Sequence, residues 1–122
     1  MKRIFYLFFI AMIVNASPVY AEEFISGFED IPMMKGFTQQ ENQTFSFGNE
    51  ETGYSEAIII TQKNISFSSV QEFYQGTLPK LGWKLLESDN SSCRFGREND
   101  ILEISRLSTG PLKLSISLRS KN

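Results

Sequence analysis

EFYQGTLPKLGW, residues Glu72 to Trp83, combines helical spacing of apolar residues with a glycine and a proline, and ends on the only tryptophan of the chain. At 100° per residue, the apolar side chains of this region fall on one arc, which predicts an amphipathic helix of about three turns. Ser69 and Glu72 have the spacing of a capping box, so we expect the helix to be capped at Ser69. The side chains on the arc are Val70, Phe73, Tyr74, Thr77, Leu78 and Leu81.

The end of this stretch has two interpretations, an elbow built around a ligand or a helix stop that docks on a sheet. Pro79 stands in the last turn, where its missing N–H costs least. Gly82 suits the left-handed position after a helix, and Trp83 then packs back on the final turn. These positions favour the helix stop. Gly76 lies off the apolar arc, and we expect close approach of the lead-in there.

Segments with strand character lie on both sides of this helix. Three consecutive β-branched residues, Ile58–Ile60, predict a strand inside a sheet, and the alternation in Leu112–Arg119 predicts antiparallel pairing with one wet face. The predicted fold is α+β, a two-layer arrangement of one main helix on an antiparallel sheet in the order β-β-α-β-β-β-β. The expected strands are Thr44–Gly48, Tyr54–Gln62, Trp83–Ser88, Cys93–Arg97, Ile101–Leu107 and Leu112–Arg119.

The first 21 residues have the layout of a cleavable signal peptide. Lys2 and Arg3 precede the apolar run Ile4–Val14, which is shorter than the roughly 20 residues of a membrane-spanning helix. Cleavage after Ala21 would leave residues 22–122 as a single domain, with an irregular lead-in over 22–43. We therefore expect an exported, periplasmic protein of bacterial origin, although a retained N-terminal anchor stays open.

The composition argues against catalysis and against nucleic-acid binding. The chain has no histidine and one cysteine, Cys93, so common general bases, zinc ligands and an internal disulfide are missing. We expect Cys93 to be a buried apolar residue rather than a nucleophile. A Ser–Lys dyad stays formally possible, but no motif singles one out. The formal net charge of −2 disfavours nonspecific nucleic-acid binding. We predict no catalytic residue, no metal site and no cofactor.

Two other features could bind a partner. The lead-in segment FEDIPMMKGF, Phe28–Phe37, gathers apolar residues and two methionines without a period, as in a docking strip or in a cap on its own domain. Lys84, Lys113 and Arg119 are predicted on the polar faces of their strands, where they could attract an anionic partner or simply solvate the sheet.

Taken together, FEDIPMMKGF, EFYQGTLPKLGW and FGRENDILEI resemble a family of small, uncharacterised exported proteins of proteobacteria, chiefly alphaproteobacteria. That family has a Phe-Glu-Asp-x-Pro-Met segment before a helix with Phe-Tyr, Leu-Pro and Leu-Gly-Trp. The likeness spans roughly residues 28–118, and one departure is Lys35, where the family pattern has proline. The resemblance implies a periplasmic address and a shared fold, and it assigns no active residues.

Three hypotheses for function remain. The first is a non-enzymatic interaction or accessory domain that binds another periplasmic component. The second is a carrier that holds a small apolar ligand or lipid between helix and sheet, through Phe73, Leu78 and Trp83. The third is an enzyme with Ser–Lys or carboxylate chemistry. The first is favoured, because about 101 residues leave little volume for a cavity once a core is packed.

Overall fold

The computed structural model of the chain describes residues 23–28, 30–48 and 53–120, of which 41–48 as backbone alone. The predicted signal peptide, residues 1–21, lies outside these ranges, and its cleavage stays a prediction. Within the described ranges, no helix is both long and apolar enough to cross a membrane.

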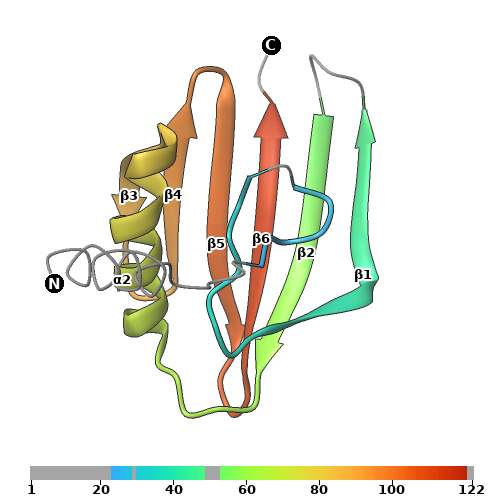
Figure 1. Cartoon of the computed structure of the whole chain (residues 1–122), viewed down its shortest axis with the longest axis vertical. Coiled ribbons are helices and arrows are strands. Elements are labelled where there is room, and N and C mark those ends of the chain that lie inside the picture. Colours follow the sequence, from blue (N-terminus) through green and yellow to red (C-terminus); the bar gives the residue numbers. More distant parts are fainter. Residues whose placement is uncertain (1–22, 29, 49–52, 121–122) are drawn as a thin grey trace, which may run out of the picture.

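Six strands form one antiparallel sheet in the order β1-β2-β6-β5-β4-β3 (Figure 1). Helix α2 (Phe67–Thr77) and the 3₁₀ helix η1 (Leu78–Leu81) carry the chain from β2 to the far edge, and β3 to β6 then return as a meander to pair with β2. The strands are β1 (Thr38–Gly48), β2 (Gly53–Thr61), β3 (Lys84–Ser88), β4 (Ser92–Arg97), β5 (Asp100–Ser108) and β6 (Leu112–Ser120).

This architecture confirms the predicted α+β class, one antiparallel sheet with one main helix. The predicted order β-β-α-β-β-β-β differs in detail, because η1 extends the helical region beyond α2. The predicted end of the irregular lead-in, at Gln43, is wrong, since β1 already begins at Thr38. The start of this strand is not predicted from the sequence, because its first six residues, TQQENQ, are polar and show no apolar alternation.

Strand β2 lies inside the sheet between β1 and β6, as the isoleucine run predicts. Its consecutive residues Ala57, Ile58 and Ile59 are all buried, so both faces of the strand are covered at its centre. A strand buried on both faces has no wet side and therefore lacks polar alternation.

Helix α2 begins one turn before the predicted cap at Ser69. Ser66 is the N-cap in extended conformation, and its hydroxyl accepts a hydrogen bond from the Ser69 N–H at 3.1 Å. The earlier start adds Phe67 to the apolar stripe, which then continues at helical spacing through Val70 and Tyr74. The predicted capping box with Glu72 is therefore wrong, because two serines precede apolar positions here and the first of them is the cap.

The end of the helical segment follows the prediction. Gly82 has φ of +96°, and its N–H donates to the Pro79 carbonyl at 3.1 Å. The Trp83 N–H donates to the Leu78 carbonyl at 3.1 Å, which completes a Schellman motif. Trp83 and Leu78 are both buried in the core, as this motif's apolar contact requires.

One hydrophobic core joins α2, the lead-in and one face of the sheet. Figure 1 shows α2 in front of β3 and β4, and the lead-in in front of β5, β6 and β2. The buried core contains Phe67, Val70, Tyr74 and Leu78 from the helical segment, Ile25, Phe28, Ile31 and Phe37 from the lead-in, and Ala57, Ile59, Cys93, Phe95, Leu102, Ile104, Leu112, Leu114 and Ile116 from the sheet, together with Trp83.

Candidate functional site

The C-terminal end of the helical segment is closed by Trp83 and Arg97. Trp83 is 2% exposed, and the guanidinium carbon of Arg97 lies 4.2 Å from the centroid of its ring. The same guanidinium donates to Asp30 Oδ2 at 2.8 Å and to the Leu81 carbonyl at 3.0 Å. Arg97, a residue of β4, thus contacts the lead-in and η1 while its guanidinium covers the Trp83 indole. These contacts hold three segments together, so we interpret the arrangement as structural.

The indole of Trp83 is enclosed in the core. Its Nε1 is buried and has no hydrogen-bond partner among the described residues. Neither of the two described pockets is lined by Trp83, Phe73 or Leu78, the residues of the predicted carrier site. Leu78 is fully buried, and Trp83 packs with it in the core. The elbow around Glu72–Trp83 is therefore a helix stop, as favoured from the sequence.

The outer face of the sheet, opposite α2, carries charges of both signs. Arg94 of β4 lies opposite Glu103 of β5 and forms a salt bridge with Glu87 of β3. Ser115 donates to the Glu56 carboxylate at 2.8 Å on the same face. The predicted basic residues Lys84, Lys113 and Arg119 stand on β3 and β6, which β4 and β5 separate. They therefore do not form one basic surface, and they solvate a mixed one.

The lead-in strip Phe28–Phe37 caps its own domain. Phe28, Ile31 and Phe37 are buried, and the Tyr74 hydroxyl of α2 donates to the Pro32 carbonyl at 2.7 Å. Burial raises the pKa of Tyr74, so the phenol keeps the proton that this bond needs. Most apolar residues of the strip thus belong to the core of their own domain, whereas Met33 and Met34 are partly buried and pack against it.

Gly76 is exposed to solvent and is not in close contact with another segment. A Cβ atom added there would meet nothing within 4 Å. The expected close approach of the lead-in is therefore wrong, and no contact with the part of the chain that the structure describes requires glycine at this position.

An exposed apolar surface lies at the β3 edge of the sheet, beside η1. It consists of Leu81, Leu85 and Leu86, which we call the leucine edge, with exposures of 36%, 46% and 53%. Leu85 pairs with Phe95 on the α2 face, while Leu86 packs beside Gly96 on the outer face. The leucines thus wrap around the strand. Sequence periodicity misses them because a bulge between Leu85 and Glu87 interrupts the alternation.

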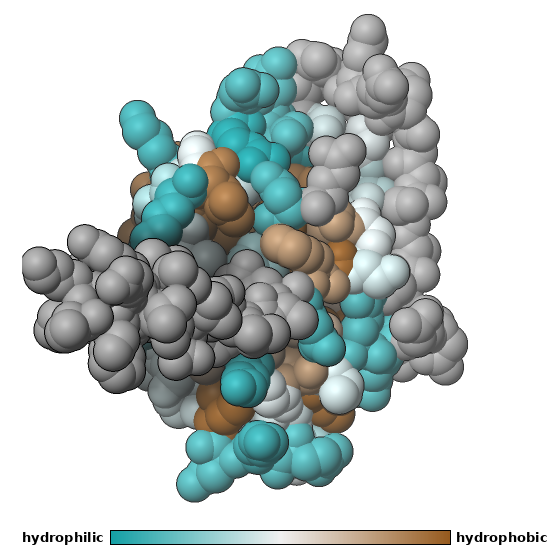
Figure 2. Space-filling view, viewed as in Figure 1, coloured by the Kyte–Doolittle hydropathy of each residue, from teal (hydrophilic) through white to brown (hydrophobic). Residues whose placement is uncertain are grey.

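Figure 2 shows, on the coloured part of the face seen in Figure 1, separate apolar patches among hydrophilic residues. Exposed leucines that follow one another at the end of η1 and along one edge strand therefore differ from the separate apolar patches of that face.

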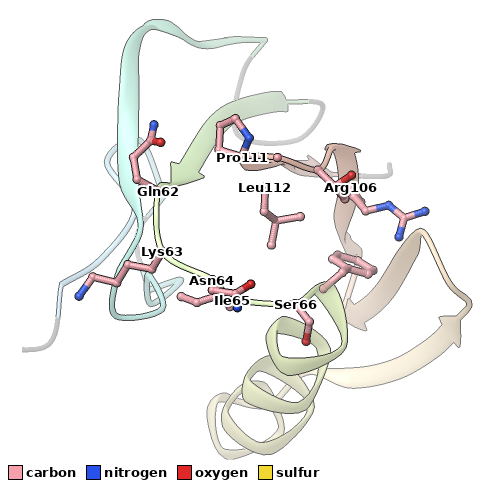
Figure 3. Close-up of a pocket in the computed structure, with 11 residues that line it drawn as sticks. Gln62, Lys63, Asn64, Ile65, Ser66, Arg106, Pro111 and Leu112 are labelled. Atoms are coloured by element: carbon pink, nitrogen blue, oxygen red, sulfur yellow. The ribbon is translucent and has the colours of Figure 1, made fainter.

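An open pocket of about 680 Å³ lies at the N-terminal end of α2. Its wall is formed by the β2–α2 connection over 62–66, the start of α2 and the β5–β6 hairpin (Figure 3). Leu112 points into its centre, whereas the side chains of Lys63 and Arg106 lie on opposite sides and extend away from the centre. The Arg106 guanidinium carbon lies 5.9 Å from the centroid of the Phe67 ring, another lining residue.

The described side chains offer little for catalysis or metal binding. No group of three potential metal ligands occurs within the described ranges. Cys93 is buried, and desolvation raises the pKa of its thiol to about 11, which disfavours the thiolate a nucleophile requires. Asp89 accepts hydrogen bonds from the backbone N–H groups of Ser91 and Ser92, which lower its pKa and make it part of a turn.

A scan of protein-family models and searches of curated proteins and of solved structures found no match to this chain. Besides the leucine edge and the pocket beside α2, a second open pocket of about 410 Å³ lies along the lead-in, where Phe24 is 49% exposed.

Proposed function

We propose that the protein is a non-enzymatic, exported envelope protein that binds another periplasmic component through the leucine edge. Exposure of Leu81, Leu85 and Leu86 at the end of η1 and along the edge strand β3 is the observation that carries this proposal. Full burial of a fully exposed leucine is worth about 1.5–3 kcal/mol, and these half-exposed side chains can still gain part of it from a partner that covers them. The proposal includes cleavage after Ala21 and a two-layer domain with α2 packed across the sheet.

The geometry of the edge supports contact through side chains rather than through an added strand. β3 has only five residues and a bulge, and it carries Lys84 and Glu87. Short length, bulges and charges are the features by which edge strands resist pairing with further strands. We therefore propose that the partner presents an apolar side-chain surface, such as one face of an amphipathic helix, with polar groups opposite Lys84 and Glu87.

A photo-crosslinking amino acid at Leu86, in the full chain expressed in its native host, tests this proposal. We expect one discrete adduct with another envelope protein, and no such adduct when the crosslinker replaces Glu72, which is exposed on α2. Equal labelling from both positions would contradict the proposal. An adduct between two copies of this chain would replace the proposed partner with a homodimer.

A matched pair of variants adds a quantitative readout. Leu86 and Leu107 are 53% and 52% exposed, on β3 and β5 respectively. We expect Leu86→Ser to weaken partner binding at least tenfold and Leu107→Ser to leave it unchanged, while both proteins keep the unfolding midpoint of the wild type. Equal loss in the two variants would mean that general surface hydrophobicity, not the leucine edge, drives association.

A further inference from the structure

The pocket at the N-terminal end of α2 is a second candidate site, independent of the leucine edge. Its lining is mixed, with four apolar residues, Leu112, Phe67, Ile65 and Pro111, among polar and charged ones. Leu112 and Phe67 are 5% and 6% exposed, so only their outermost atoms face the pocket. The volume of about 680 Å³ lies in the range of sites for small organic ligands.

The charges around this pocket are all of one sign. Lys63 and Arg106 are its ionisable lining residues, and none of the eleven lining residues carries a carboxylate. The chain as a whole has a formal net charge of −2, so a region with two cations and no anion departs from the rest of the molecule. Such a region attracts anions by Coulomb interaction.

The placement of the two cations distinguishes an amphiphile from a free anion. Leu112 occupies the centre, and the side chains of Lys63 and Arg106 lie on opposite sides of it and extend away from it (Figure 3). A small inorganic ion bound beside one of these cations would leave the apolar lining residues Leu112, Phe67 and Ile65 uncovered. A molecule with an apolar chain on these residues and an anionic group beside one of the cations fits both features, because long lysine and arginine stems can bend toward the head group.

We infer that this pocket binds a single-chain amphiphile with an anionic head group, an alkyl phosphate or alkyl carboxylate. The hydrocarbon chain contacts Leu112, Phe67 and Ile65, and the head group pairs with Arg106 or Lys63. This site differs in place from the space between helix and sheet near Trp83, and it requires a charge on the ligand.

Calorimetric titration of the full chain with decyl phosphate, below its micelle concentration, tests the inference. We expect saturable binding that strengthens by up to about fourfold for each further methylene buried, in an octyl-to-decyl comparison. Inorganic phosphate should bind at least tenfold more weakly, and so should the neutral decyl maltoside. Equal binding of phosphate would overturn the role of the apolar lining residues, and equal binding of the maltoside would overturn the role of the cations.

Charge-neutral variants locate the site. Lys63→Gln combined with Arg106→Gln should weaken decyl phosphate binding at least tenfold, whereas Lys80→Gln combined with Lys84→Gln removes two exposed cations outside the pocket and should leave it unchanged. Circular dichroism melts verify that all four substitutions preserve folding. Equal weakening in the two double variants would show that overall charge, rather than the pocket, attracts the ligand, and would overturn the assignment. Leucine-edge variants should not change this binding, so the two proposals fail or succeed separately.

Discussion

The two ends of the helical segment are built in opposite ways. At its C-terminal end, Gly82 reverses the chain, Trp83 enters the core, and Arg97 covers the indole while it pairs with Asp30. At its N-terminal end, the Ser66 hydroxyl caps the backbone, but the chain around it leaves an open pocket. The C-terminal end is specified by neighbouring residues in the sequence. The N-terminal end is formed by segments that are distant in the chain. The C-terminal end contributes to stability, and the N-terminal end is where we propose that a ligand binds.

The largest expected effect lies at the C-terminal end. Trp83→Ala removes a side chain that is 2% exposed, leaves a cavity and deprives Arg97 of its stacking surface. We expect a loss of about 3–5 kcal/mol in the free energy of unfolding, a large part of the total for a domain of this size. Urea denaturation measures it. A Trp83→Ala protein with the stability of the wild type would remove the basis for treating this end as structural.

The next effect concerns the core beneath the helix. Burial raises the pKa of the Cys93 thiol to about 11, from 9.0 for the free group. The folded state therefore holds its proton where the unfolded state has lost it, so the stabilising contribution is complete below pH 9 and declines as pH rises toward 11. This decline amounts to about 2 kcal/mol.

Unfolding midpoints measured from about pH 8 to pH 11 follow this decline, with Cys93→Ala as the control that lacks the thiol. The alkaline loss should be smaller in Cys93→Ala than in the wild type. Identical pH dependence in the two proteins would contradict a buried neutral thiol. Tyr74 adds a similar loss only above its ordinary pKa of 10.0, since burial raises its pKa as well, and this loss is common to both proteins.

Gly82→Ala tests how much the left-handed conformation at the end of η1 contributes to stability. A φ of +96° lies in the region that side chains with a Cβ rarely adopt, and the new methyl would lie 3.3 Å from Arg97 Cδ. We expect a loss of about 1–2 kcal/mol in unfolding free energy. Gly82→Asn should lose less, because asparagine tolerates the left-handed conformation better than alanine. Equal losses would point to the contact with Arg97 as the cause rather than to backbone strain.

The smallest effect has the opposite sign. Gly76 lies in α2, and a methyl group added there meets nothing within 4 Å. Gly76→Ala should therefore raise the unfolding free energy by up to about 1 kcal/mol, because alanine restricts the unfolded chain and favours helix. Thermal unfolding measures the gain. A loss of stability would reveal a role for this glycine that its surroundings do not suggest.

The difference between the two ends also explains what the sequence could predict. The helix stop follows from adjacent residues, Pro79, Gly82 and Trp83, whose conformational preferences act locally. The interior position of β2 follows from its isoleucine run, since a strand that is apolar on both faces must be covered twice. Local chemistry decides both features, and both predictions are confirmed by the structure.

The pocket and the leucine edge depend on topology and on bulges. Residues 62–66 and 106–112 meet only because β6 returns beside β2, which no local pattern encodes. Leu85 and Leu86 are exposed because β3 is the edge strand, and their alternation is broken by a bulge. The lead-in is hard to predict for a similar reason, since its buried residues fit into the core without a regular period.

One NMR titration tests the contrast between the ends most directly, because Trp83 is the only tryptophan and gives a single indole N–H signal. During titration with decyl phosphate, we predict that the amide signals of Lys63, Ser66 and Arg106 shift with saturation while the Trp83 indole signal stays in place. A shift of the indole signal, with the amides around Lys63 unchanged, would contradict this contrast and would place the ligand at the C-terminal end.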